Sequence, residues 1–349
     1  MSTLHNHVVF LCHYFHPRIG GVEKHVYQVS RALIKRNYQV TVISSQYDSN
    51  LPVNEIINNI RVIRIKLSSN NWHHPSKTEL WPWMFNHIKL FKQAGLVHCH
   101  DVFYWYLPLR FLLPHVPIFT TFHGYEGVCP PSRKAILIRK ISEKLSKGNV
   151  CVGDYIIKWY GTKSDEVIYG GTLIPEKIPL PTTTKSALFL GRIDNDSGIH
   201  IYLQALSQLK KQGLYIKAEF CGGGSLENEA KKYGKLLGFQ KDITKPLLRN
   251  RFAFVSSYLT ILEAMAHKRL VFAVYDNPLK RDTLLMSPFT EYINISSTST
   301  ELAQQIKYYL TNKSAENEIV EKAFKWVKSQ TWSVVADQYE KLWLKKVKF

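Results

Sequence analysis

Glycines that follow apolar runs are the first residues whose type and spacing could do chemistry. Gly20 and Gly21 lie between an expected strand, His7–Phe15, and an expected helix, Val22–Arg36. Backbone N–H groups at the start of a helix attract phosphate, and glycine lets a ligand approach closely. The run Gly222-Gly223-Gly224 also follows an expected strand. A simple turn is the alternative in both places, and neither run has the GxGxxG spacing that would indicate a nicotinamide cofactor.

Two charged side chains in the second half of the chain are further candidates for ligand binding. Arg192 comes after an apolar strand and Gly191, so its guanidinium could pair with a diphosphate. Glu263 lies early in an expected helix, Thr260–His267, where its carboxylate could accept hydrogen bonds from ligand hydroxyls and where N–H groups near Thr260 could bind phosphate. A surface arginine and a helix-stabilising carboxylate, contributing about 0.3–1 kcal/mol, are the alternatives.

Histidines offer a third kind of chemistry. His123 ends the expected strand Pro117–Phe122, where a ring can bond a sugar hydroxyl or stabilise developing charge. His98, Cys99 and His100 could suggest a metal site. Alternate residues of a strand share a face, so Cys99 should point away from both histidines, and no metal site is predicted.

These residues need sheets to position them, and the apolar pattern predicts two. Short strands alternate with helices from His7 onward, which indicates parallel sheets covered by helices on both faces. Prolines and threonines then interrupt the pattern before it restarts near Ala187. We expect an α/β protein with two Rossmann-like domains facing a cleft, in which ligands sit at the carboxyl ends of the strands.

The predicted domain bounds follow from these composition changes. Residues 1–170 are expected to form an N-terminal domain, 171–186 a linker and 187–330 a C-terminal domain. Residues 331–349 form a helix with one apolar side, which needs a partner surface. Within the second domain, residues 226–237 are expected to be helical.

Charge narrows the class of partner. The 349 residues carry 46 Lys+Arg against 27 Asp+Glu, a net charge of +19. The excess is spread evenly, with +10 in residues 1–170 and +9 in 171–349, which favours headgroups or anionic ligands at least as much as nucleic acid.

Five cysteines without a CxxC fit a reducing compartment. No signal peptide is predicted, and three prolines argue against a spanning helix in Val102–Phe122.

One basic segment could meet an anionic surface. Residues 133–147 place Ala135, Ile138, Ile141 and Leu145 at helical spacing and have a net charge of +5. A membrane-surface helix and a helix packed on the sheet with a solvated charged face are equally good interpretations. The membrane-facing candidates are Arg133, Lys134, Arg139, Lys140, Lys144 and Lys147.

Several segments, in order, resemble one known family. Phe15–Gln28, with its paired glycines, is similar to the N-terminal signature of the family-four glycosyltransferases with the GT-B fold. Val97–Asp101, Thr120–Gly124, Phe189–Asp194 and Leu262–Ala266 resemble successive strand ends and the donor-site helix of that family, and the closing helix from Thr331 matches as well. The resemblance spans nearly the whole chain.

The resemblance implies a retaining, metal-independent glycosyltransferase that uses a nucleotide-diphosphate sugar as co-substrate and has no cofactor. It implies catalytic roles for His123, Arg192 and Glu263. It implies donor binding by Gly20, Gly21, Gly191, Arg192, Gly222, Gly223, Thr260 and Glu263. A glycan or lipid-linked acceptor in cell-surface polysaccharide or glycolipid synthesis is expected, in the cytoplasm or on the cytoplasmic face of the membrane.

Two positions depart from the family pattern. Val255 stands where a glutamate usually meets the donor sugar, and Ser197 where a lysine usually meets phosphate. Each charge-assisted bond contributes about 1.5–3 kcal/mol, so losing both weakens the enzyme unless other groups substitute. The candidates are Asp276, Lys280, Arg281 and Asp282. A non-catalytic, glycosyltransferase-like binding protein or partner subunit is therefore the alternative function. A nucleic-acid-binding protein is less well supported, because no recognition motif is present.

Overall fold

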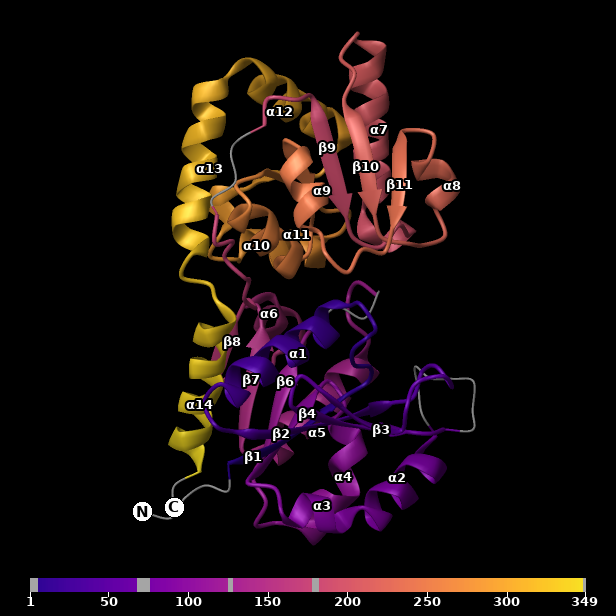
Figure 1. The fold of residues 1–349 in the computed structure, drawn as a ribbon, viewed down its shortest axis with the longest axis vertical. Helices are drawn as coiled ribbons and strands as arrows, with labels where there is room; N and C mark the ends of the chain where they lie inside the picture. The colour runs from indigo at the N-terminus through magenta and orange to yellow at the C-terminus, as the bar shows by residue number, and fades with distance from the viewer. Residues whose placement is uncertain (1–5, 68–75, 125–127, 178–181, 348–349) are drawn as a thin grey trace. The chain divides into compact units, whose positions relative to one another are not determined.

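The computed structural model describes residues 6–67, 76–124, 128–177 and 182–347. The chain divides into two compact units, residues 1–168 with 332–349 (unit 1) and residues 169–331 (unit 2). Residues 178–181 of the predicted linker and the last two residues of the predicted C-terminal helix lie outside the described part. Both units are α/β, as predicted (Figure 1).

Unit 1 is built on one eight-stranded sheet with the order β3-β4-β2-β1-β5-β6-β7-β8, in which only β3 is antiparallel to its neighbour. Its strands are β1 (His7–Cys12), β2 (Gln39–Ser45), β3 (Asn54–Ile57), β4 (Ile60–Ile65), β5 (Leu96–His100), β6 (Ile118–Phe122), β7 (Gly148–Val152) and β8 (Glu166–Ile168). Its helices are α1 (Gly21–Ile34), α2 (Lys77–Asn86), α3 (Ile88–Lys92), α4 (Phe103–Leu112), α5 (Arg133–Leu145), α6 (Tyr155–Tyr160) and α14 (Trp332–Lys346).

The two faces of this sheet have different partners because strand residues alternate. On one face, Val97 and Cys99 join an apolar cluster with the helices α2, α3 and α4. On the other, Phe10 and His98 contact Trp343 of α14, which packs beside α1. Arg36 ties α14 down further, through ion pairs to Asp337 and Glu340.

Unit 2 has a six-stranded parallel sheet with the order β11-β10-β9-β12-β13-β14. Its strands are β9 (Ser186–Leu190), β10 (Lys217–Cys221), β11 (Gly234–Gly238), β12 (Phe252–Phe254), β13 (Leu270–Val274) and β14 (Asn294–Ser296). Its helices are α7 (Ile199–Lys211), α8 (Glu227–Ala230), α9 (Thr244–Arg249), α10 (Tyr258–Ala266), α11 (Pro278–Leu285), α12 (Ser299–Thr311) and α13 (Lys313–Val327), with short 3₁₀ turns at Asn195–Ser197 and Thr290–Tyr292. The helices α7 and α12 bury their apolar faces against the strands.

The predicted helix over residues 226–237 is wrong, because α8 ends at Ala230 and β11 follows. Gly234 explains the difference. A Cβ at this position would lie 2.1 Å from the carbonyl oxygen of Ala218, so only glycine lets β11 pair this closely with β10. The strand β3 was not predicted either.

None of the helices among the described residues is both long and apolar enough to cross a bilayer. The stretch 102–122 instead folds as α4 followed by β6. Pro108 lies inside α4, and the helix ends before Pro114.

Candidate active site

The strand order of unit 2 reverses between β9 and β12. The first strand in sequence, β9, pairs with the second strand, β10, on one side and with the fourth, β12, on the other. Ligands of doubly wound sheets bind outside the carboxyl ends of the strands at such a reversal. Gly191 and Arg192 directly follow β9, and α10, which carries Thr260 and Glu263, begins shortly after β12. Gly191 and Arg192 therefore flank the reversal on one side, and Thr260 and Glu263 flank it on the other.

Arg192 is well placed to exchange its present partner for a ligand. Its side chain is 63% exposed, and one guanidinium nitrogen lies 2.6 Å from a carboxylate oxygen of Asp196. Exposed ion pairs of this kind contribute only about 0–1 kcal/mol, so a diphosphate can compete with the carboxylate.

A second carboxylate fixes the loop that carries Arg192. Asp194 accepts hydrogen bonds from the backbone N–H and the hydroxyl of Ser225, at 2.7 and 2.8 Å. These two bonds lower the pKa of the Asp194 carboxyl. The loops after β9 and β10 are thereby held together.

The N-terminus of α10 has no side-chain cap on its backbone N–H groups. Ser257 is the N-cap residue, but its hydroxyl lies 2.8 Å from the hydroxyl of Thr260 instead. The first N–H groups of the helix and its positive dipole end remain suited to an anion. Glu263 lies one turn further along and is half-buried.

The glycine run after β10 has a structural reason. A Cβ at Gly222 would lie 1.8 Å from the carbonyl oxygen of Gly191, and one at Gly224 would lie 2.4 Å from that of Ile193. Both residues also have positive φ, at 141° and 158°. Close packing of two loops accounts for these glycines without a ligand, while Gly223 lies between them at the same strand end.

In unit 1 the strand order reverses between β1 and β5, and Gly20 and Gly21 follow β1. The carboxylate of Glu23 fills the space beside Gly20, where a Cβ would lie 2.1 Å from one of its oxygens. Burial raises the pKa of Glu23, and Arg18, 3.5 Å away, opposes the change. Among the described residues, no atom would contact a Cβ at Gly21 within 4 Å. A carboxylate at this place suits ligand hydroxyls better than phosphate.

His123 follows β6 on the same edge of unit 1. Its backbone N–H donates to the carboxylate of Asp101, at 3.1 Å, and its ring Nε2 lies 2.9 Å from Nδ1 of His100. Burial, and secondarily the nearby Arg139, lowers the pKa of His123 to about 3. The ring is therefore neutral at physiological pH, and its Nδ1 remains for a ligand hydroxyl. Of the two roles predicted for His123, hydrogen bonding fits this environment.

Sequence reasoning missed a buried hydrogen-bonded chain behind His123. The indole nitrogen of Trp343 donates to Nδ1 of His98 at 3.1 Å, and indole can only donate, so Nε2 of His98 carries the proton. That Nε2 lies 2.7 Å from the hydroxyl of Thr121, which lies 2.8 Å from the hydroxyl of Tyr339. The tyrosine hydroxyl in turn lies 3.0 Å from Nε2 of His25.

The hydrogen bonds can run in one direction, from Trp343 to His25, only when His98 and His25 are both neutral. Burial lowers the pKa of His25, His98 and His100 well below the usual value, in agreement with that requirement. The rings of His98 and His100 stack 5.1 Å apart, while Cys99 lies in the apolar cluster on the opposite face. In the described residues, no three His, Cys, Asp or Glu side chains are grouped closely enough to hold a metal ion.

The basic helix α5 is oriented differently from the prediction. Arg139 is buried, donates to the carbonyl of Gly124 at 2.8 Å and lies 3.7 Å from Asp101, so its assignment as a membrane-facing residue is wrong. Lys140 donates to Glu143 and to the carbonyl of Gly161. The rest of the predicted basic surface, namely Arg133, Lys134, Lys144 and Lys147, is exposed.

Three apolar residues of α5 are exposed as well, whereas Ala135, Ile136 and Leu145 are partly buried. Leu137, Ile138 and Ile141 are 61%, 46% and 43% exposed. Ile138 and Ile141 were predicted to lie on the apolar side of this helix, facing either a membrane or the sheet, and the structure turns both toward solvent rather than toward the sheet. The reason is that Arg139 and Ser142 take the inward positions.

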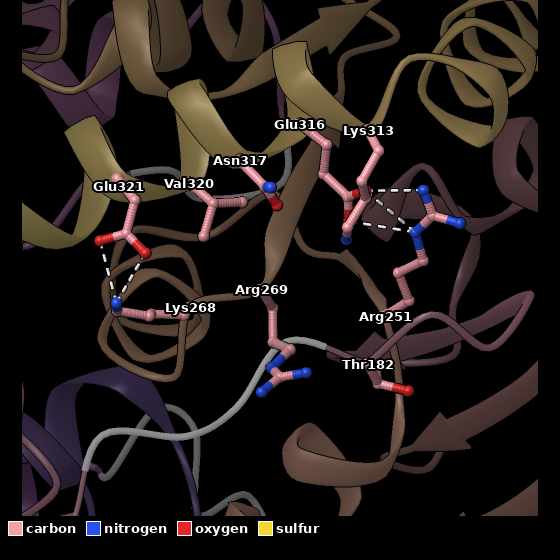
Figure 2. A pocket seen from close by; sticks show the side chains of 9 residues that line it. All are labelled: Thr182, Arg251, Lys268, Arg269, Lys313, Glu316, Asn317, Val320 and Glu321. Carbon is pink, nitrogen blue, oxygen red and sulfur yellow. Dashed lines mark hydrogen bonds and ion pairs between the residues drawn. The ribbon is translucent and has the colours of Figure 1, made fainter.

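A hollow in unit 2 lies at the opposite edge of its sheet from Arg192 and the N-terminus of α10 (Figure 2). Arg251 and Arg269 immediately precede β12 and β13, so it lies at the amino ends of the strands. Figure 2 shows Arg251 directed at Glu316, and the closest of their atoms are 2.6 Å apart. The hollow measures about 10 Å³, which is room for about one water molecule.

Comparisons with known proteins agree with this geometry. Residues 19–171 match the sequence profile of Glycosyltransferase Family 4, and residues 172–326 match that of Glycosyl transferases group 1. Among solved structures, a sucrose-phosphate synthase from Thermosynechococcus elongatus superposes with a TM-score of 0.75 at 17% identity, covering 97% of this chain and 98% of that one. HepE from Anabaena, solved with UDP and glucose, gives a TM-score of 0.72 at 14% identity, covering 97% and 99%.

Two curated relatives are similar over a shorter segment. The GPI3 subunit of phosphatidylinositol N-acetylglucosaminyltransferase from Saccharomyces cerevisiae is 30% identical over 95 residues, which is 27% of this chain. A subunit of the phosphatidylinositol N-acetylglucosaminyltransferase from Homo sapiens is 24% identical over 104 residues, or 29% of this chain. The matched segment spans about a fifth, 21%, of the length of each relative.

Proposed function

Because the chain belongs to the GT-B glycosyltransferases of the family-four type, we propose that it transfers a sugar from a nucleotide-diphosphate donor to a glycan or lipid-linked acceptor. The observation that carries the proposal is the placement of Arg192 and the uncapped N-terminus of α10 on either side of the strand-order reversal in unit 2. A guanidinium and the backbone N–H groups of a helix N-terminus at that point suit a diphosphate.

Each residue then has a role that its surroundings support. Arg192 stabilises the charge that builds on the departing diphosphate, and Glu263 holds the ribose hydroxyls. His123, neutral with a pKa of about 3, bonds a hydroxyl of the transferred sugar. We propose that the configuration at the anomeric carbon is retained, that no metal takes part and that the departing diphosphate accepts the acceptor's proton.

The first test is binding, followed by transfer. A nucleoside diphosphate that binds only the folded protein raises the unfolding midpoint, so a thermal-shift screen identifies the base. Product formation in EDTA then tests metal independence, and NMR of the product's anomeric proton tests retention. An inverted product, or transfer that stops in EDTA, would contradict those parts of the proposal.

Substitution of Arg192 tests the site itself. We expect Arg192→Ala to weaken nucleoside diphosphate binding about 10- to 100-fold, because one charge-assisted bond is lost. Arg249→Ala is the matched control. Arg249 is also a half-exposed arginine of unit 2 that lies 2.6 Å from one carboxylate, but it precedes β12 at the other edge of the sheet. Equal affinity in both variants would refute the placement of the donor.

We also propose that the acceptor is reached at the cytoplasmic face of an anionic membrane, through α5. Its exposed Leu137, Ile138 and Ile141 lie among basic residues, a combination suited to headgroups and acyl chains. The test is co-sedimentation with phosphatidylserine vesicles at low salt. Ile141→Ser should reduce binding, while Ile56→Ser, which changes an exposed isoleucine of β3, should not. Failure of the unchanged protein to sediment would remove this part of the proposal.

A non-catalytic binding protein is the second candidate, and Val255 favours it. This residue directly follows β12 with only 1% of its surface exposed, and it brings no carboxylate to the donor sugar. The two candidates differ in turnover: the binding protein would bind a nucleotide sugar without hydrolysing or transferring it. A donor panel assayed for both reactions separates them.

A further inference from the structure

Lys280 is a cation at a place where a helix already has positive charge. It is the third residue of α11, whose N-cap, Asn277, accepts the Lys280 backbone N–H at 3.0 Å. The N-terminus of a helix repels a cation, so the two together attract an anion more strongly than either does alone. At present the ammonium nitrogen lies 2.8 and 2.9 Å from the two carboxylate oxygens of Asp276.

The same ammonium group reaches the loop of Arg192. Its nitrogen donates to the backbone carbonyl of Asp196 at 2.5 Å, and the carboxylate of Asp196 accepts from Arg192 at 2.6 Å. A single residue therefore holds both cations. Ser197 next to it cannot act as a cation, and its hydroxyl donates to the carbonyl of Asp194 at 2.7 Å.

The topology brings a third positive group to this edge. The strands β9, β12 and β13 are neighbours in the sheet, and they lead into the Arg192 loop, α10 and α11 respectively. The uncapped N-terminus of α10 thus arises from the strand between those that precede Arg192 and Lys280. Three groups that bind anions come from three adjacent strand ends.

We propose that Lys280 binds the diphosphate of the nucleotide sugar together with Arg192 and supplies the cation that position 197 lacks. The inference rests on the proposed function. An ammonium group has three N–H donors, so Lys280 can keep its bond to Asp196 while a phosphate oxygen replaces Asp276. Asp276 is then a competitor that holds the lysine in place until the donor arrives.

Opposite effects of two substitutions separate this role from a structural tie. Lys280→Ala should weaken nucleoside diphosphate binding about 10- to 100-fold, through loss of a charge-assisted bond. Asp276→Asn should tighten it about two- to five-fold, because the competing ion pair is removed. If Lys280, held by Asp276, only joins α11 to the loop of Asp196, both substitutions should lower the unfolding midpoint and change the affinity in the same direction.

The double variant excludes an indirect effect. Lys280→Ala alone leaves Asp276 without its ion-pair partner, and that carboxylate could repel phosphate. Binding by Lys280→Ala with Asp276→Asn should remain about 10-fold or more weaker than that of the unchanged protein. Recovery of full affinity in the double variant would overturn the proposal, since it would show that Lys280 acts only by neutralising Asp276.

Lys322→Ala is the matched control. Like Lys280, Lys322 pairs with a carboxylate four residues earlier in the chain, that of Glu318 at 2.6 Å, but it lies on α13. Its affinity should be unchanged. The probes are UDP, GDP and ADP, measured by isothermal titration calorimetry with folding checked by circular dichroism. If the unchanged protein binds none of them, the proposed function fails and this inference with it. If it binds one and Lys280→Ala binds that one equally well, only this inference fails.

Discussion

Mild acid should destabilise unit 1, because three histidines are buried there without charge. His25, His98 and His100 are at most 2% exposed, and burial lowers the pKa of each well below the usual value of about 6.5. The unfolded chain takes up these protons near pH 6.5, whereas the folded chain does not. Stability contributed by the neutral rings is therefore complete above about pH 6.5 and falls as the pH decreases.

The size of the effect follows from the proton count. Each histidine that is neutral when folded contributes a slope approaching about 1.4 kcal/mol per pH unit below its unfolded pKa. Between pH 6 and pH 5 the loss is about 1.2 kcal/mol for each, so about 3.6 kcal/mol for the three. His123 acts in the same direction. Burial raises the pKa values of Glu23 and Asp101, and these two groups act in the opposite direction.

Tryptophan fluorescence can follow this transition in unit 1 specifically. Seven of the eight tryptophans fall within residues 1–168 and 332–349, and only Trp326 lies in unit 2. Urea unfolding at several pH values between 7 and 5 gives the free energy of unfolding at each pH. Its slope against pH reports the number of protons that the unfolded state takes up.

Substitutions test whether the buried histidines cause the slope of the unfolding free energy against pH. His98→Gln should reduce the loss between pH 6 and pH 5 by about 1.2 kcal/mol, because one titrating group is removed. His115→Gln changes an exposed histidine and should leave the loss unchanged. An equal loss between pH 6 and pH 5 in His98→Gln and in the unchanged protein would refute the neutral, buried state of His98, and with it the direction assigned to the hydrogen-bonded chain.

Three further substitutions test the packing around the candidate site. Gly222→Ala should cost on the order of 3 kcal/mol in unfolding free energy, because its Cβ would lie 1.8 Å from a carbonyl oxygen. The control Gly213→Ala, at positive φ but in open space, should cost about 1 kcal/mol. Equal costs by urea unfolding would contradict the close approach at Gly222. Val255→Glu should destabilise the protein by about 3–5 kcal/mol and should not increase transfer, since it buries an unpaired carboxylate. A stable and more active variant in the donor assay would contradict this expectation. Tyr339→Phe should cost about 1–3 kcal/mol in unfolding free energy, because it removes the hydrogen bonds of the tyrosine hydroxyl to Thr121 and to Nε2 of His25. No cost would argue against the hydrogen-bonded chain.

The fold could be predicted because its signal is local. Buried parallel strands are short apolar runs, and the helices between them have a 3.6-residue period, so the two α/β units could be recognised from the sequence. The failures have local causes too. The edge strand β3 has a mixed pattern, with Asn54 and Ile56 exposed, and β11 was hidden because residues 226–237 have helical spacing until Gly234 requires a strand.

The candidate site could be predicted only where a residue follows a strand. Gly191, Arg192 and Thr260 belong to segments that the sheet order brings to one edge, so strand position alone was informative. Arg139 could not be assigned from spacing, because a buried cation needs partners that come from elsewhere in the chain, here Gly124 and Asp101. The histidine chain could not be predicted for the same reason, since α14 supplies its tyrosine and tryptophan from more than 200 residues away.

The role proposed for Lys280 illustrates why comparing a motif position by position can undervalue a site. The loops after β9 and β13 are separated by about eighty residues in sequence, yet one strand lies between them in the sheet. A cation can therefore be lost from the first loop, at Ser197, and supplied from the other, while the ligand meets the same charge at the same edge. No such exchange is available at Val255, because a carboxylate that bonds a sugar hydroxyl must lie at one distance and direction, whereas a charge acts over several ångströms. We therefore expect the contacts to the donor's diphosphate to be as strong as the family pattern implies, and the contacts to the donor's sugar to be weaker.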